Sequence, residues 1–121
     1  MSKKKYTVIL ANTAQFSIEN QIQFLAGHAP TEVSQAAAYG HVMPLVDQVV
    51  SLLGAAPNAY PVAPELAKLG ITKFRRLLVE NFRVFYEVNE LSLTVTVILF
   101  INQRQSVERA LVDYAILGSL P

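Results

Sequence analysis

Residues 73–104, KFRRLLVENFRVFYEVNELSLTVTVILFINQR, decide the fold of this chain. β-branched and aromatic side chains dominate the stretch, as they do in strands. We therefore expect three consecutive antiparallel strands, the first ending at Leu77–Val79, the second over Phe82–Val88 and the third over Leu93–Asn102. Glu80–Asn81 is the expected two-residue turn, and Asn89–Ser92 is the expected polar loop.

The turns set the register of the strands, and the register assigns each side chain to a face of the sheet. The expected cross-strand pairs are Val79 with Phe82, Arg76 with Phe85, Val88 with Leu93, Phe85 with Thr96 and Arg83 with Ile98. One face then collects apolar side chains, namely Leu77, Val79, Phe82, Val84, Tyr86, Val88, Leu93, Val95, Val97 and Leu99. The other face is mixed, with Arg76, Arg83, Phe85, Glu87, Thr94 and Thr96, and with Asn102 and Arg104 at its far end. We expect a core over the first face and a partly open second face.

The composition limits the classes of protein that this chain can belong to. Its 121 residues suit one domain, which we take to span residues 1–121. No apolar run reaches the roughly 18 residues of a membrane span. The basic start, Met1–Lys5, leads directly into a strand pattern and does not resemble a secretory signal. The absence of cysteine excludes disulfides and thiol chemistry and fits a reducing compartment, so we expect a cytoplasmic protein with no membrane partner.

Helical patterns flank the three strands. A short strand, Tyr6–Leu10, precedes a helix that Asn12 or Thr13 would cap and that Gly27 would end. Its apolar positions are Ala14, Phe16, Ile18, Ile22, Phe24 and Leu25. A second helix begins after Pro30–Thr31 and ends near Gly54.

Pro44, a proline-rich segment and Ser106 mark the remaining features. Pro44 lies inside the second helix, where its ring should kink or break it. Residues 57–70 form a proline-rich connection with one helical turn at Glu65–Ala67. Ser106 caps a last helix with Val107, Leu111, Tyr114 and Ala115 on one side. The expected order is β-α-α-β-β-β-α, an α+β fold of two layers in which an antiparallel sheet packs on a helical hairpin.

The usual catalytic motifs are missing from the sequence. There is no nucleophilic cysteine, no G-x-S-x-G motif and no glycine-rich phosphate loop. His28 and His41 have no second ligand at metal spacing, so we expect no metal and no cofactor. Glu80, Glu87 and Glu90 do not form an acid/base pair.

The remaining chemistry is that of arginine. Arg76, Arg83 and Arg104, with Lys73 and Arg75 near one end, would bind phosphates, and Phe85 between them would offer a stacking surface for a base. The alternative is that Arg83 pairs with Glu87 on its own face and that the other cations are solvated. Composition and spacing leave both interpretations open.

The same residues resemble a known family. The pattern Arg76-Leu77-Leu78-Val79-x-x-Phe82-Arg83-Val84-Phe85-Tyr86-Glu87-Val88 is similar to the signature hairpin of the RelE/ParE superfamily of bacterial toxins. The opening Tyr6-x-Val8 strand and the late Val97-Ile98-x-Phe100 strand, which ends near Gln103–Arg104, also lie where that family has them. The resemblance covers nearly the whole chain.

The resemblance implies a toxin of a type II toxin–antitoxin module, also called a plasmid stabilisation protein, that a cognate antitoxin neutralises by wrapping around it. Some members cut mRNA on the ribosome without a metal, and others inhibit DNA gyrase without being enzymes. In the cutting branch the matched catalytic positions are Arg83, Arg76 and Arg104. Lys73, Arg75 and Phe85 are then candidate RNA-binding residues, and a homodimer is a further expected state.

The chain also departs from the family pattern. Ala110 stands where the cutting branch often carries a tyrosine, and residues 101–105 replace the H-x-x-R-D ending of many gyrase-directed members. Three expectations therefore remain: a ribosome-dependent endoribonuclease, a gyrase-directed toxin, and an inactive relative kept as an antitoxin-binding protein.

Overall fold

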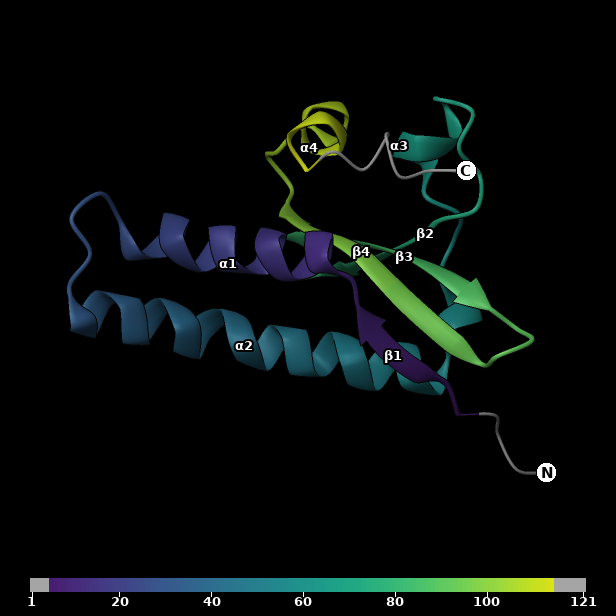
Figure 1. The fold of residues 1–121 in the computed structure, drawn as a ribbon, viewed down its shortest axis with the longest axis horizontal. Coiled ribbons are helices and arrows are strands. Elements are labelled where there is room, and N and C mark those ends of the chain that lie inside the picture. Colours follow the sequence, from purple (N-terminus) through teal and green to yellow (C-terminus); the bar gives the residue numbers. More distant parts are fainter. Residues whose placement is uncertain (1–4, 115–121) are drawn as a thin grey trace.

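The computed structural model describes residues 5–114 and contains one mixed sheet with helices on both of its faces (Figure 1). The elements are β1 (Thr7–Leu10), α1 (Asn12–Ala26), α2 (Glu32–Ala55), a 3-10 turn (Pro57–Ala59), α3 (Pro64–Ala67), β2 (Arg75–Val79), β3 (Phe82–Asn89), β4 (Thr94–Asn102) and α4 (Val107–Asp113). This order confirms the predicted β-α-α-β-β-β-α arrangement. No helix within residues 5–114 is long and apolar enough to span a bilayer.

The strands lie side by side in the order β1-β4-β3-β2. β2, β3 and β4 form the predicted antiparallel meander, whereas β1 pairs with β4 in parallel at the edge of the sheet. The sheet is therefore mixed rather than antiparallel throughout. Residues far apart in the chain become neighbours at this edge, where Val8 lies opposite Val95.

The first hairpin has the predicted register, because its two-residue turn allows only one pairing. Val79 lies opposite Phe82, and Arg76 lies opposite Phe85. Glu80 in the turn has a φ of 50°, the left-handed conformation that such a turn requires.

The predicted register of the second hairpin is wrong for two reasons. Leu93 belongs to the turn, with a φ of 53°, so Val88 pairs with Val95 instead. A β-bulge then adds a residue to β4 opposite the Phe85–Tyr86 step, so that Tyr86 faces Val97 and Phe85 faces Leu99. In consequence Arg83 lies opposite Ile101 and not Ile98.

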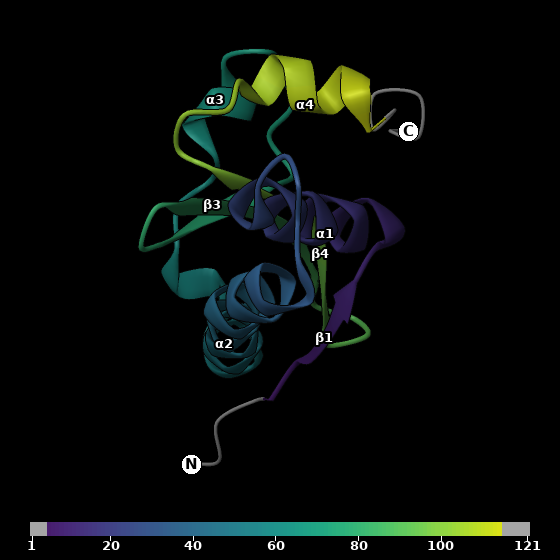
Figure 2. The same ribbon diagram turned by 90° about the vertical axis from the view of Figure 1, so that its left-hand side faces the viewer.

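The bulge gives the sheet two apolar faces. The first core joins the sheet to α1 and α2, with Ala14, Ile18, Val42, Val46, Val49, Leu53, Leu77, Val84, Tyr86, Val95, Val97 and Phe100 among its buried residues. The second core consists of Ala63, Leu66, Phe74, Phe85, Leu99, Ile101, Val107, Ala110 and Leu111. It lies beneath α3 and α4, on the opposite side of the sheet from α2 (Figure 2). The second face, expected to be mixed and partly open, thus carries a second core, since β4 brings Leu99 and Ile101 to it.

Two helix predictions also need correction. The residue before α1 is Ala11, which offers no side-chain cap, and Thr13 Oγ1 instead donates to the carbonyl of Ile98 at 2.6 Å. α2 continues through Pro44, whose side chain is exposed, for 24 residues without a break. The predicted Ser106 cap is confirmed, since the N–H of Arg109 donates to Ser106 Oγ. Thr31 caps α2 in the same way, because its Oγ1 accepts from the N–H of Ser34. Ala115 lies outside the described residues.

Candidate functional site

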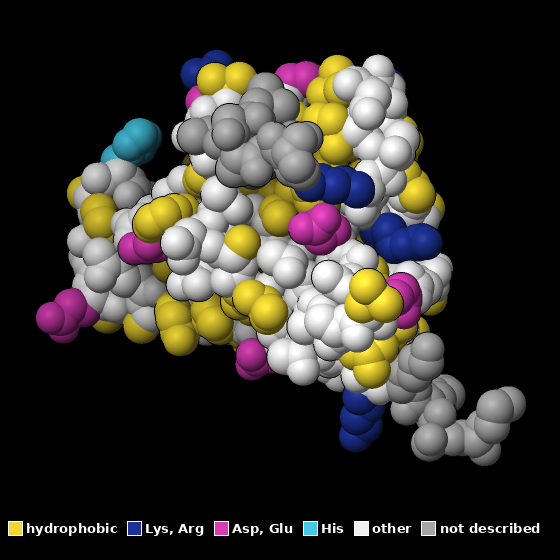
Figure 3. Space-filling model, turned by 45° about the vertical axis from the view of Figure 1, so that its right-hand side comes forward, with side chains coloured by type: hydrophobic (Ala, Val, Ile, Leu, Met, Phe, Trp, Pro, Cys, Tyr) yellow, Lys and Arg dark blue, Asp and Glu magenta, His cyan; other side chains and the backbone are white. Residues whose placement is uncertain are grey.

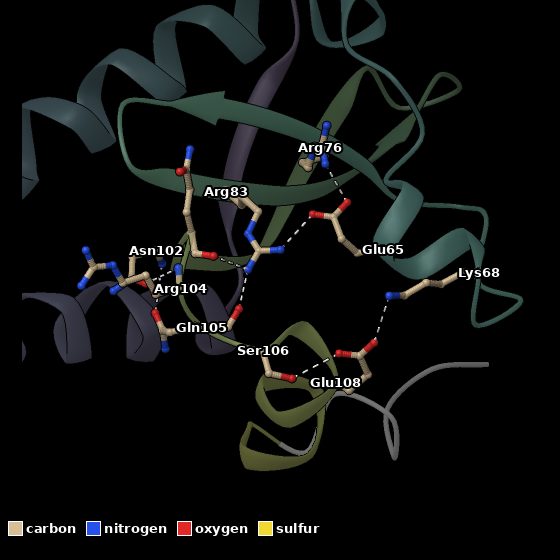
Figure 4. Close-up of polar contacts among 10 residues, drawn as sticks. Glu65, Lys68, Arg76, Arg83, Asn102, Arg104, Gln105, Ser106 and Glu108 are labelled. Carbon is tan, nitrogen blue, oxygen red and sulfur yellow. Dashed lines mark hydrogen bonds and ion pairs between the residues drawn. The ribbon is translucent and has the colours of Figure 1, made fainter.

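Two strands and one short helix bring three charged side chains together on the second face of the sheet (Figure 4). Arg76 of β2 and Arg83 of β3 both point toward Glu65 of α3. Arg76 Nη1 lies 2.9 Å from Glu65 Oε1, and Arg83 Nη1 lies 3.1 Å from Glu65 Oε2. One carboxylate thus bridges two guanidinium groups, with one oxygen on each.

The backbone fixes the position of α3 beside β2. The N–H of Ala63 donates to the carbonyl of Phe74 at 2.9 Å, and the N–H of Arg76 donates to the carbonyl of Pro61 at 3.0 Å. Leu66 anchors the helix from below, because its side chain is buried in the second core. These contacts leave Glu65 directed at the arginine pair.

Arg83 is also held from the other side. Its Nη2 donates to the carbonyl of Gln105 and, at 3.4 Å, to that of Gln103, both in the turn after β4. The side chains of Arg83 and Glu65 are each 15% exposed, and that of Arg76 is 23% exposed. The Nε atoms of both arginines are buried and have no hydrogen-bond partner within residues 5–114.

The arginines keep Glu65 ionised. Burial alone would raise the pKa of its carboxyl group, but a backbone hydrogen bond and the nearby guanidinium groups of Arg83 and Arg76 outweigh burial and lower the pKa. The trio therefore consists of two cations and one anion at neutral pH.

The three side chains line a shallow cleft with a volume of about 480 Å³. Its walls are Pro64, Glu65, Lys68, Arg76, Leu78, Arg83 and Gln103. At the rim, Lys68 Nζ lies 3.5 Å from Glu108 of α4, and both side chains are more than half exposed. Such an exposed pair contributes little stability, so Lys68 is available to a ligand at the rim.

The other predicted site residues do not join this cleft. Arg104 is exposed and lines a separate hollow between α1 and α4, beside Phe24 and Tyr114. Arg75 occupies the opposite face of β2, where its guanidinium donates to the carbonyl of Tyr60.

Phe85 and Lys73 also differ from expectation. Phe85 is fully buried in the second core, because the bulge places Leu99 opposite it and α4 covers both. It cannot be a stacking surface in this conformation, which corrects the prediction. Lys73 lies 3.9 Å from Glu87. The alternative pairing of Arg83 with Glu87 is therefore wrong as well, since Arg83 pairs with Glu65.

Glu65 is not among the site residues that the sequence predicts. Its helical turn was predicted, but the segment was interpreted as a connection, and nothing in the local pattern indicates that it folds over β2. One signal was available, because two arginines on a partly covered face require a nearby acid. Among the described residues, no three His, Cys, Asp or Glu side chains gather in a way that could hold a metal ion.

The helical hairpin of α1 and α2 has an apolar surface without lysine or arginine, unlike the arginine cleft. No lysine or arginine occurs between residues 6 and 67. Four large apolar side chains of α1 and α2 are more than half exposed: Phe16, Phe24, Val33 and Tyr39. Figure 3 shows hydrophobic side chains along the hairpin, at the left of the view, where no lysine or arginine is visible.

Comparison with known proteins identifies the fold. No protein-family model matches this sequence, and no curated protein matches it. A chain in the crystal structure of the toxin–antitoxin complex RelBE2 from Mycobacterium tuberculosis superposes with a TM-score of 0.52 at 17% sequence identity. The match covers 82% of this chain and 99% of that chain. The predicted fold is thereby confirmed as similar to that of a chain in this RelBE2 complex.

Proposed function

We propose that this protein is the toxin component of a type II toxin–antitoxin module and that it acts on RNA through the arginine cleft. The observation that carries the proposal is the convergence of Arg76 and Arg83, from two strands of a RelE-like sheet, on one bridging carboxylate. An anion already occupies the place where a phosphate group would bind. A cognate antitoxin, as in the superposed complex, is the proposed partner.

The chemistry of the cleft suits a phosphodiester. Guanidinium groups bind phosphate oxygens with paired hydrogen bonds and stabilise negative charge that develops at phosphorus. In RNA cleavage the 2′ hydroxyl gives up its proton to a base such as water as its oxygen bonds to the adjacent phosphorus. The bond from phosphorus to the 5′ oxygen breaks, and the leaving 5′ oxygen takes up a proton. Ala110 stands at the family's tyrosine position, so we assign Arg76 and Arg83 charge stabilisation and not proton transfer.

A translation reaction programmed with a defined mRNA tests the proposal. The purified protein should produce discrete mRNA cuts that depend on the presence of ribosomes, mapped by primer extension. Arg83→Ala should reduce the cleavage rate by about 100-fold, the usual effect of losing one transition-state donor. Arg109→Ala is the matched control, because Arg109 is exposed and pairs only with Asp113 at 3.7 Å among the described residues. Cleavage that persists in Arg83→Ala, or absent cleavage by the wild type, contradicts the assignment.

The helical hairpin favours a second candidate, a toxin that inhibits a host protein such as DNA gyrase without cutting nucleic acid. Surfaces rich in aromatic side chains and poor in charge are typical of protein interfaces, and Phe16 and Phe24 on α1 fit this description. Inhibition of gyrase supercoiling in the absence of mRNA cleavage, lost in Phe24→Ser, would support this candidate over the first.

A further inference from the structure

We infer that Glu65 is an internal competitor of the ligand's phosphate group, so that the cleft binds RNA only when this carboxylate leaves the arginine pair. The inference rests on the proposed function, because it concerns regulation of the same cleft. It assigns to α3 a role beyond connecting the helix layer to the sheet.

The carboxylate imitates the ligand in geometry. Its two oxygens contact two different guanidinium groups at 2.9 and 3.1 Å. The two non-bridging oxygens of a phosphodiester carry one negative charge between them, as the two oxygens of a carboxylate do, and they would use the same donors.

The Nη2 and Nε donors of Arg83 cannot serve instead. Its Nη2 is bound to carbonyl groups of the turn after β4, and its Nε is buried. Arg76 Nε is buried as well. The accessible donor of Arg83 is therefore Nη1, where a phosphate competes with Glu65 for the N–H that faces Arg76.

The net charge of the cleft also indicates that Glu65 opposes ligand binding. With Glu65 bound, the trio has a net charge of +1, and with Glu65 displaced the two guanidinium groups present +2 to a ligand. The side chains are at most 23% exposed, so solvent and salt screen this difference less than they would at the surface.

The binding of a fluorescent single-stranded RNA oligonucleotide, measured by anisotropy, tests the inference directly. Glu65→Gln removes the negative charge and preserves the size of the side chain. We expect its dissociation constant to be at least about tenfold lower than that of the wild type, which corresponds to about 1.4 kcal/mol. Glu19→Gln, an exposed substitution on α1 with the same change in net charge, should bind within about twofold of the wild type.

A second variant, which keeps the negative charge, controls for effects of misfolding on the measured RNA affinity. Glu65→Asp keeps the charge but is one methylene shorter, so it cannot bridge both guanidinium groups at hydrogen-bond distance. Its affinity should fall between those of the wild type and Glu65→Gln. The gain in RNA affinity that Glu65→Gln produces should disappear when Arg83→Ala is added to it.

The inference is overturned if neither Glu65 variant binds RNA more tightly than Glu19→Gln. This result is distinct from failure of the proposed function, which is judged by mRNA cleavage and growth. A wild type that cuts mRNA while Glu65→Gln shows no gain in affinity leaves the function standing and removes the competitor. Tighter RNA binding by Glu65→Gln in a chain that cuts no mRNA supports the role of Glu65 as a competitor and contradicts the proposed function.

Discussion

Glu65 determines the electrostatics of the cleft at the scale of single residues. Two guanidinium groups on adjacent strands repel each other, and each has a buried Nε without a partner in the described part of the chain. The bridging carboxylate compensates for this repulsion at two contacts. The same contacts oppose ligand binding, so stability and affinity should change in opposite directions when Glu65 is replaced.

We expect Glu65→Gln to lower the free energy of unfolding by about 1–3 kcal/mol at pH 7, less than for a fully buried pair because the trio is partly exposed. Urea denaturation measures the change. Glu19→Gln, on an exposed helix surface, should stay within about 0.5 kcal/mol of the wild type.

The stability difference should also depend on pH in a defined direction. The pKa of Glu65 is lowered in the folded protein, so its contribution is present above the unfolded-state pKa of about 4.3. It is lost as the pH falls through the folded-state value. The gap between wild type and Glu65→Gln should therefore shrink below about pH 4, and a gap that widens there would refute the role of the carboxylate.

At the scale of elements, α1 completes the edge of β4 where β1 ends. The last parallel pair is Leu10 with Val97. Beyond it, Thr13 Oγ1 donates to the carbonyl of Ile98, and Ser17 Oγ accepts from the N–H of Phe100 at 2.9 Å. Side chains of α1 thus make the hydrogen bonds to β4 that the backbone of a neighbouring strand would otherwise make beside the bulge.

Ser17→Ala should lower the free energy of unfolding by about 1–3 kcal/mol, because it leaves the N–H of Phe100 buried without an acceptor. Ser17 is fully buried, whereas Ser51 on α2 is exposed. Ser51→Ala is therefore the matched control, and it should be neutral or slightly stabilising. Equal effects of the two substitutions in urea denaturation would mean that the contact to β4 contributes no stability.

The two hairpins show how far local sequence determines structure. The register of the first was predictable because Glu80–Asn81 leaves no choice of turn. The second was not, because Asn89 Oδ1 accepts from the N–H groups of Leu91 and Ser92 and lengthens the turn to include Leu93. No glycine or proline marks the bulge at Ile98.

The candidate site was also predictable only in part. Arg76 and Arg83 share a face because the first hairpin fixes them there. Glu65 lies 18 residues before Arg83 on a separate element, so long-range contacts bring it to the pair: the packing of Leu66 into the second core and the backbone hydrogen bonds between residues 61–63 and β2. The burial of Phe85 could not be predicted, since it depends on the bulge.

The distribution of charge organises the molecule as a whole. The first half of the chain contributes a helical hairpin without lysine or arginine. The lysines and arginines of residues 68–109 lie in β2, β3, α4 and the connections, with Lys68 directly after α3. RNA contacts and protein contacts are thus proposed for different parts of the molecule, the arginine cleft and the hairpin.

Bacterial growth after induced expression tests the central claim most directly. We predict that the optical density of cultures expressing the wild-type chain stops rising after induction. Cultures expressing Arg83→Ala at the same protein level should grow like uninduced cells, and those expressing Arg109→Ala should arrest like the wild type. Unimpaired growth with the wild-type chain, at a protein level confirmed by immunoblot, would contradict the claim that this RelE-like fold is a toxin.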